Sequence, residues 1–239
     1  MLFRSAFVDD DDVWAPDKLI RQVAAAEENG RDWAYAGAVN VGSRLEIVSG
    51  SPPPPPDAVM EALPRYNPIP GGSSNVIIRR SALAAVGGFD ERLPPCEDWE
   101  LSARLARAGP PASVDGPLVG YRLHAGNSSL DIARILGAVR LIEQLHGRTV
   151  DWGRMHRWLA ESYLRTGDRA EALGQFARAA LNGQARGVAS DLAAILTRHI
   201  ERATGWRNRK RTVSTKCWGA GASAWLRNLD GCAPAERHG

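Results

Sequence analysis

Three short segments of the sequence carry side chains that could do chemistry. Four consecutive aspartates occupy positions 9–12, an acidic pair occupies positions 97 and 98, and an arginine and a histidine stand two apart at positions 122 and 124. Carboxylates bind hard cations or accept protons, arginine neutralises phosphate, and a neutral imidazole ligates metals. The segments therefore indicate a site for a metal, a phosphate or a proton, although each also has a purely structural interpretation.

The aspartate run is suited to bind a hard cation. Alternate side chains of an extended chain point the same way, so we expect Asp9 and Asp11 to share one side. Two carboxylates aimed at one point suit Mg²⁺ or Mn²⁺, which fill their remaining positions with water and substrate phosphate. An EF-hand loop is excluded, because the sixth residue from Asp9 is Trp14 instead of glycine and the twelfth is Ile20 instead of glutamate. The alternative is a solvated acidic turn that caps the helix beginning near Pro16.

The other two segments are equally open to two interpretations. Glu97 and Asp98 begin a predicted helix, whose positive end favours the ionised carboxylate that a general base requires. Their alternative is a stabilising charge at a helix start. Arg122 and His124 lie on one face of a predicted strand, where they could bind phosphate and metal. The alternative for His124 is a strand-end side chain with no ligand role.

An alternation of strands and helices would position these segments. The sequence predicts a first strand whose end is Ala6–Val8. Further strands are predicted over 33–41, 44–48, 75–79 and 118–123. It predicts helices over 17–29, 57–63, 81–86 and 97–108, the first with Leu19, Ile20, Val23 and Ala24 on its buried face. The proline run over 51–56 predicts an exposed, stiff loop. This order indicates an α/β layer structure.

From Leu130 onward the pattern is helical only. The spacing of small and apolar residues over 159–179 matches a tetratricopeptide repeat, and a generic helical hairpin is the alternative. A helix over 186–200 is expected to pack against this hairpin, because one repeat cannot bury its own face. The range 205–239 has no periodicity, so we expect disorder there.

Net charge, cysteine spacing and the length of apolar runs limit which partners, covalent links and cellular locations are expected for this protein. The net charge is only +3, so no polyanionic partner is required, and the basic run over 207–211 is more typical of a solvated tail than of a nucleic-acid or anionic-lipid contact. The three cysteines, at positions 96, 217 and 232, lack the spacing of a disulfide framework or a zinc knuckle. No apolar run reaches the roughly 20 residues of a membrane span, and the apolar start is too short for a signal peptide. We expect a cytoplasmic protein, with attachment to the inner face of the membrane left open.

Together and in this order, the three segments resemble family 2 glycosyltransferases. FVDDDDVWAPDKLIRQ resembles their D-x-D segment, and VGYRLHAGNSS resembles the segment that closes their active site. GGSSNVIIRRSALAAVGGFDERLPPCEDWELSARLARAG is similar to their acceptor-side segment. The resemblance covers residues 6–130 and implies a glycosyltransferase A-type fold. The expected fold class is therefore α/β, an incomplete A-type (Rossmann-like) sheet layer followed by an all-α helical hairpin region.

The resemblance also implies a domain organisation. Residues 1–129 would be the C-terminal part of the catalytic domain, 130–204 a tetratricopeptide-like extension such as some bacterial members carry, and 205–239 a basic tail. Family members normally place a strand-helix-strand half, which holds the nucleotide base, before the D-x-D. Only Met1–Ser5 precede Ala6 here, so the resemblance predicts a truncated catalytic domain that binds donor weakly and turns over little.

The roles of the polar residues are implied by the same resemblance. Asp9 would contact the nucleotide ribose or the metal, and Asp11, with Asp12 beside it, would be the main ligand through which Mg²⁺ or Mn²⁺ holds the diphosphate. His124 would be a further metal ligand. Arg122 would contact the diphosphate or a loop.

The acceptor side completes the implied site. Asp98 would deprotonate the acceptor hydroxyl, giving transfer with inversion, while Glu97 and Trp99 would shape the acceptor pocket. The loop that contains Gly72 and Ser73 would lie near the donor sugar.

The implied partners are a nucleotide-sugar donor and a glycan or lipid-linked acceptor, as in glycan or cell-surface polysaccharide synthesis, and no nucleic acid. Two competing hypotheses are a non-catalytic protein that binds a partner through its helical extension, and a phosphate-metal hydrolase that uses the aspartates. The order of the acidic and histidine segments favours the transferase over the hydrolase. The intact acidic segments argue against the non-catalytic protein, whereas the short segment before the aspartates argues for it.

Overall fold

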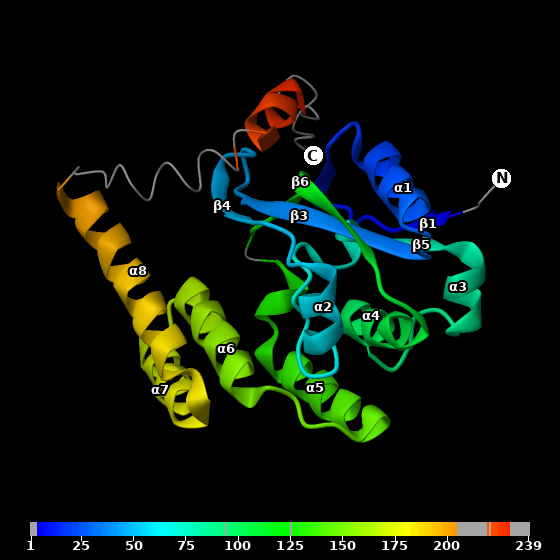
Figure 1. The fold of residues 1–239 in the computed structure, drawn as a ribbon. Coiled ribbons are helices and arrows are strands. Elements are labelled where there is room, and N and C mark those ends of the chain that lie inside the picture. Colours follow the sequence, from blue (N-terminus) through cyan, green and yellow to red (C-terminus); the bar gives the residue numbers. More distant parts are fainter. Residues whose placement is uncertain (1–3, 94, 125, 205–218, 220, 230–239) are drawn as a thin grey trace, which may run out of the picture.

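The computed structural model describes residues 4–93, 95–124, 126–204, 219 and 221–229, which form a curled sheet flanked and followed by helices (Figure 1). The strands are β1 (Arg4–Ala6), β2 (Val13–Trp14), β3 (Trp33–Val41), β4 (Ile47–Ser51), β5 (Ile77–Arg79) and β6 (Ala112–Arg122). The helices are α1 (Lys18–Glu28), α2 (Pro56–Ala62), α3 (Arg80–Ala85), α4 (Glu97–Ala108), α5 (Ile132–His146), α6 (Trp152–Thr166), α7 (Arg169–Ala179) and α8 (Ala185–Thr204). Shorter turns are η1 (Gly72–Asn75), η2 (Ser128–Leu130) and η3 (Ala180–Gln184). The mixed α/β architecture confirms the predicted fold class and is consistent with a partial glycosyltransferase A-type domain.

The sheet is built around two long central strands. Its strand order is β1-β5-β3-β6-β2, with β4 also paired to β3. β3 and β6 are parallel, whereas β1, β2, β4 and β5 pair with their neighbours in the antiparallel direction. Nearly every residue of β3 is buried, which is typical of a strand covered on both faces.

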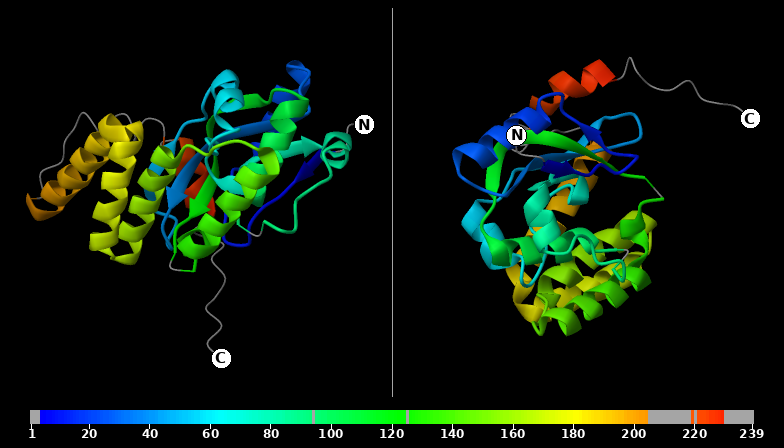
Figure 2. Two further views of the ribbon diagram at one scale, coloured as in Figure 1. Left: turned by 90° about the horizontal axis from the view of Figure 1, so that it is seen from below. Right: turned by 90° about the vertical axis from the view of Figure 1, so that its right-hand side faces the viewer.

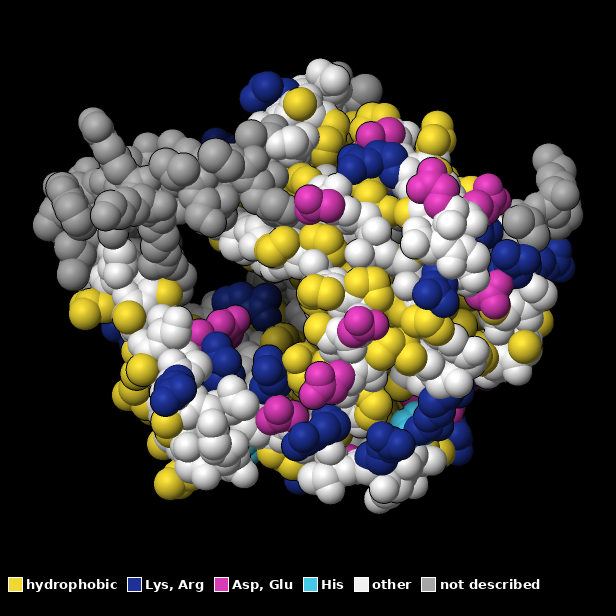
Figure 3. Space-filling view, in the orientation of Figure 1, with side chains coloured by type: hydrophobic (Ala, Val, Ile, Leu, Met, Phe, Trp, Pro, Cys, Tyr) yellow, Lys and Arg dark blue, Asp and Glu magenta, His cyan; other side chains and the backbone are white. Residues whose placement is uncertain are grey.

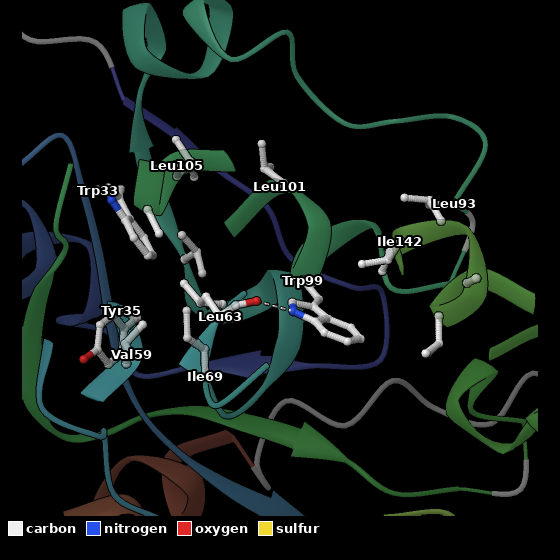
Figure 4. Packing of buried hydrophobic residues seen from close by; sticks show 14 of the residues in the cluster. Trp33, Tyr35, Val59, Leu63, Ile69, Leu93, Trp99, Leu101, Leu105 and Ile142 are labelled. Carbon is white, nitrogen blue, oxygen red and sulfur yellow. Dashed lines mark hydrogen bonds between the residues drawn. The ribbon is translucent and has the colours of Figure 1, made fainter. Parts of the chain in front are cut away.

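The larger core lies on the face of the sheet toward α2, α4 and α5 (Figures 1 and 4). Trp33 and Tyr35 of β3 pack there with Trp99 of α4, and α5 contributes Ile135 and Val139 to the same cluster. The expected domain boundary between residues 129 and 130 therefore falls within one continuous hydrophobic core. Catalytic residues placed on α4 would depend on α5 for support.

The opposite face of the sheet is covered by α1 and by a helix over 221–229 (Figure 1). Ala222 and Leu226 are fully or almost fully buried against Val39 and Val41 of β3, and Trp225 Nε1 donates to the carbonyl of Pro117 at 3.1 Å. These apolar residues recur at positions 222, 225 and 226, so they form one face of a helix. The disorder expected over 205–239 thus does not extend to this helix, while positions 205–218, 220 and 230–239 lie outside the described residues.

The Leu226→Ala substitution is expected to lower the free energy of unfolding by about 2–3 kcal/mol, because it removes a buried side chain and leaves a cavity. The measurement is urea unfolding of the full chain. Arg227→Ala, an exposed position in the same helix, serves as the control and should change stability by less than about 0.5 kcal/mol. Equal stability of the two variants would contradict the packing of this helix on the sheet.

The buried face of α1 differs from the prediction. Lys18, Gln22 and Ala26 are the buried residues, whereas Leu19 and Ile20 are 44% and 75% exposed. The reason is a polar network: Lys18 Nζ donates to Gln22 Oε1 at 2.8 Å, so the buried polar atoms satisfy each other. Val23 of the predicted face does pack against the cluster of Ala26 and Ile77, but Leu19 and Ile20 were wrongly placed on the buried face.

The first strand is also shorter than predicted. β1 ends at Ala6, and Val8, predicted to be its buried end, is 52% exposed. The chain then turns, with the amide of Asp12 donating to the carbonyl of Asp9 at 3.1 Å. The aspartates therefore lie in a turn instead of an extended strand.

The helices after α5 stack beside the sheet, and α6 also packs against the larger core through Trp152, Met155 and Trp158 (Figure 2). α6 and α7 are an antiparallel hairpin whose turn is Gly167, with a φ of 89°, followed by Asp168, which caps α7. α8 closes the stack through Val188, which packs with Phe176 of α7. The assignment of this hairpin to a tetratricopeptide repeat stays a prediction. No helix in the described part of the chain is long and apolar enough to cross a membrane.

Candidate functional site

A tight turn gathers three of the four aspartates. One carboxylate oxygen from each of Asp9, Asp11 and Asp12 lies within 4.8 Å of the other two. Asp10 is exposed and lies outside this group. The turn, and not the alternation of an extended chain, brings the oxygens together, and it adds Asp12 to the pair expected from the sequence. We call these three residues the aspartate group.

Asp12 is the buried member of the aspartate group, with 9% of its surface exposed. Its Oδ1 accepts a hydrogen bond from the amide of Arg122 at 3.0 Å, whereas Oδ2 is buried without a hydrogen-bond partner among the described residues. Burial raises the pKa of Asp12 to about 6. Because a buried carboxylate oxygen without a partner is unfavourable, this atom fits a place where a cation would bind.

The end of β6 holds the aspartate turn in place. Arg122 Nε donates to the carbonyl of Asp11 at 2.8 Å, and its Nη1 donates to the carbonyl of Ser43 at 3.0 Å. His124 Nε2 lies 2.6 Å from Asp11 Oδ2. Of the two contacts that the resemblance implied for Arg122, the structure contains the contact to a loop. His124 directly contacts one of the expected metal ligands.

The Gly/Ser loop lies against the aspartate group. The amide of Asp9 donates to Ser74 Oγ at 3.0 Å, and Ser73 Oγ donates to Asp9 Oδ1 at 3.2 Å. Burial raises the pKa of Asp9. Gly71 and Gly72 have φ angles of 76° and 56°, a backbone conformation that glycine adopts without strain. These contacts place η1 directly beside the metal-binding candidates.

The start of α4 also lies close to η1. A Cβ atom added to Gly72 would lie 3.4 Å from Asp98 Oδ2. Asp98 Oδ1 accepts from the amide of Trp99 at 2.7 Å. Burial, and then the charge of Glu97, raise the pKa of Asp98 to about 6. Burial also raises the pKa of Glu97. The short η1 turn thus contacts the aspartate group and also approaches Asp98, whose pKa is raised to about 6.

The chain enters α4 through a strained residue. Cys96 has a φ of 68°, which is uncommon for a residue other than glycine, asparagine or aspartate. Such strain costs on the order of 1 kcal/mol and occurs most often beside functional residues. Here it precedes the acidic pair directly, and it sets the direction in which Glu97 and Asp98 leave the turn.

Trp99 is not at the surface of the site. It is 3% exposed, lies in the core and donates from Nε1 to the carbonyl of Leu63 at 2.8 Å (Figure 4). A side chain in this position cannot line an acceptor pocket directly, in contrast to the role that the resemblance implied. It instead fixes the base of α4 against the segment that follows α2.

A buried polar network beneath η1 was missed by the sequence analysis. Gln22 Nε2 donates to the carbonyl of Asn75 at 2.7 Å, and Asn75 Nδ2 donates to the carbonyl of Ala36 at 2.6 Å. Lys18 Nζ lies 4.1 Å from the ring of Trp14, and burial lowers the pKa of Lys18 to about 7. The network ties η1 to α1 and β3. The available signal was a polar pair four residues apart on α1, but hydrophobic periodicity conceals it.

One cavity in the described part of the chain lies away from these residues. It has a volume of about 540 Å³ and is bounded by the turn 87–92 and by residues of α4 and α5. Neither Asp98 nor any member of the aspartate group lines it. The candidate site is therefore the open surface around η1.

Fold and site together define an α/β protein in which the Gly/Ser turn η1 lies next to the aspartate group and to a further, half-buried carboxylate, that of Asp98. Residues 60–166 of this chain match the model of the family described as Glycosyltransferase like family 2. No curated protein shows significant similarity to the chain. The match supports glycosyl transfer as the general class of activity.

The extent of the match differs from the resemblance seen in the sequence. It includes Gly72, Asp98 and His124, continues through α5 and α6, and covers just under half of the chain. The aspartate group lies outside the matched residues. Its connection to the matched segment rests on the contacts of Ser73, Ser74, Arg122 and His124 described above.

Proposed function

We propose that this protein is a metal-dependent glycosyltransferase that moves a sugar from a nucleoside diphosphate to a hydroxyl of a glycan or lipid-linked acceptor, with inversion. One observation carries the proposal: η1 touches the aspartate group through Ser73 and approaches Asp98 through Gly72. A donor on η1 would then lie close both to the metal ligands and to the base. The family match to residues 60–166 supports the reaction class.

The aspartate group fits Mg²⁺ or Mn²⁺. It offers hard oxygen ligands from Asp9, Asp11 and Asp12, and the buried Oδ2 of Asp12 has no other partner in the described residues. His124 would orient Asp11 or join the ligands. When bound, the ion would stabilise the negative charge that develops on the departing diphosphate. Ser73 and Gly72 would lie along the donor, and Arg122 would keep the aspartate turn in its conformation.

Asp98 would accept the proton of the acceptor hydroxyl. A carboxylate with a pKa of about 6 is ionised at pH 7 and still basic enough to take a proton as the new bond forms. Inversion would require Asp98 to act on the face of the sugar opposite the leaving group. Its approach to Gly72, the residue next to the Ser73 that bonds Asp9, is compatible with that requirement. Glu97 would border the acceptor.

A nucleotide-sugar donor and a glycan or lipid-linked acceptor are the partners of this proposal. On the face seen in Figure 3, basic and acidic side chains are interspersed. A cytoplasmic location, near the membrane face where lipid-linked acceptors occur, is part of the proposal. A second role, binding of a protein partner by the helical extension, is favoured by the exposed Leu173, Leu181 and Leu196, which are 64%, 87% and 61% exposed.

The test is a radiolabelled-donor assay, sensitive enough for low turnover, with a panel of uridine, guanosine and thymidine diphosphate sugars and simple alkyl glycosides as acceptors. We expect release of nucleoside diphosphate that requires both acceptor and Mn²⁺ or Mg²⁺. Asp11→Asn should reduce transfer at least about a hundredfold, because it removes charge from the metal site. Asp10→Asn, an exposed neighbour outside the aspartate group, is the matched control and should retain most activity. Acceptor-independent cleavage of phosphate esters would support the hydrolase alternative instead.

A further inference from the structure

Asn67 lies in the loop between α2 and η1, and its side-chain amide faces Asp98. Its Nδ2 donates to Asp98 Oδ2 at 3.3 Å, while its Oδ1 accepts from the amide of Ile69 at 3.0 Å. An amide oxygen accepts and an amide nitrogen donates, so the Ile69 contact fixes which end of the Asn67 side chain points at the carboxylate. The donor end therefore faces Asp98.

The loop that carries Asn67 is held by the helical extension. The amide of Asp151, the residue that caps α6, donates to the carbonyl of Arg65 at 2.9 Å. The guanidinium of Arg154 lies 4.3 Å from the centre of the Tyr66 ring, a cation–π contact. Both contacts flank Asn67 on its N-terminal side, so the amide is presented from a fixed backbone.

The hydrogen bond from Asn67 reaches the oxygen of Asp98 that faces η1. Asp98 Oδ1 accepts from the amide of Trp99, whereas Oδ2 accepts from Asn67 and is the oxygen nearest to Gly72. The other charged groups that act on Asp98 are Glu97 and Asp9, both acidic, and both favour its protonated form. A donor on Oδ2 opposes them, because a hydrogen bond to a carboxylate stabilises the ionised form.

We propose that Asn67 is a positioning residue for Asp98. Its amide orients Oδ2 of Asp98 toward Gly72 and η1, where the donor would lie, and keeps the Asp98 carboxylate ionised. This inference rests on the proposed role of Asp98 as the base. It also assigns a task to the loop between α2 and η1, which the sequence marks only as a turn-forming NPIP segment. Through Arg65 and Tyr66, the start of α6 stabilises that loop and so supports the site.

The decisive variant is Asn67→Asp, which preserves the shape of the side chain and the acceptor for the Ile69 amide. It replaces the donor to Asp98 with a second carboxylate. Carboxyl-carbon NMR titration of the metal-free, ligand-free full chain, with the Asp98 signal assigned from Asp98→Asn, reports the pKa directly. We expect the apparent pKa of Asp98 to rise by about one unit in Asn67→Asp, where the two carboxylates titrate as a coupled pair, and by less in Asn67→Ala. Asn29→Ala, which removes an exposed asparagine bonded to the carbonyl of Ala25, is the control and should leave it unchanged.

Transfer kinetics provide the second measurement. In Asn67→Asp the acidic limb of the pH profile of kcat/KM should move upward by the same amount, and kcat at pH 7 should fall about tenfold with little change in donor KM. Thermal unfolding of each variant checks that the fold is retained. Asn67→Ala removes the hydrogen-bond donor to Asp98 without adding a negative charge.

The outcomes separate this inference from the proposed function. Transfer that is present in the wild type, lost in Asp98→Asn and unchanged in Asn67→Asp would overturn the positioning role alone. An Asp98 pKa that stays the same in both Asn67 variants would also overturn it. Absence of transfer in the wild type, together with the NMR shift, would overturn the transferase proposal and leave Asn67 as a residue that only sets the orientation and pKa of Asp98.

Discussion

Asp98→Asn is expected to lower the kcat of glycosyl transfer by about a thousandfold, because general-base catalysis contributes roughly 10² to 10⁴ in rate. The substitution preserves the size of the side chain and its acceptor oxygen for the amide of Trp99, so binding of donor and acceptor should change little. The measurement is steady-state transfer with the donor and acceptor identified from the panel. Asp115→Asn, an exposed aspartate on β6, is the matched control and should have wild-type kcat.

The pH dependence gives an independent check of the same residue. Under the proposed role of Asp98 as the base, its ionised form is the active one, and burial raises its pKa to about 6. Activity in the wild type should therefore fall as the pH drops below about 6 and should level off above it. In Asp98→Asn the residual rate should lose this dependence. A wild-type profile that is flat between pH 5 and pH 8 would contradict the assignment of Asp98 as the base.

The sequence predicted the parts of the structure that depend on local patterns. The alternation of strands and helices, the Gly/Ser loop, and a helix that begins at Glu97 all follow from spacing and from residues that favour turns or helix starts. The same reasoning placed Asp98 at the first turn of α4, where the structure has it. Local signals were sufficient here because helix and turn formation depend mainly on neighbouring residues.

The features that depend on contacts between distant segments could not be predicted in this way. Arg122 holds the aspartate turn through the carbonyl of Asp11, 111 residues away in sequence, and also bonds the carbonyl of Ser43, 79 residues away, so no local pattern reveals these contacts. Lys18 is buried because Gln22 and Asn75 provide a polar path, which reverses the face chosen by hydrophobicity. Trp99 sits in the core because Leu63 accepts its indole proton. In each case hydrogen bonding across the fold decided the position of the side chain.

Part of the candidate site lies inside the segment that matches the family model, and part lies outside it. The family match includes Asp98 and His124 but not the aspartate group. The structure nevertheless places His124 Nε2 2.6 Å from Asp11 and Ser73 Oγ 3.2 Å from Asp9. The aspartate turn is therefore positioned by residues of the matched segment. Its chemistry can be tested without any donor, which separates metal binding from turnover.

Asp12→Asn is expected to stabilise the metal-free protein and to weaken metal binding. The pKa of Asp12 is raised to about 6 in the folded state, above the value of about 3.9 for an unfolded chain, so ionisation is less favourable in the folded state. The wild type should therefore lose stability as the pH rises from about 4 to about 6, by on the order of 2 kcal/mol, and stay at the lower value above that range. The neutral asparagine removes this loss while its oxygen still accepts from the amide of Arg122.

The measurement is denaturant unfolding at pH 4 and pH 7, with EDTA or with MnCl₂, and calorimetric titration with Mn²⁺ at pH 7. In EDTA the variant should equal the wild type at pH 4 and exceed it at pH 7, because only the wild type carries the buried charge at pH 7. Mn²⁺ should stabilise the wild type by RT ln(1 + [Mn²⁺]/Kd) and the variant by less, with an affinity lower by at least about tenfold. Asp10→Asn should behave like the wild type in every condition. Equal Mn²⁺ affinity for the wild type and Asp12→Asn would show that the Asp12 carboxylate is not a ligand of the ion, and that its buried Oδ2 does not bind the cation.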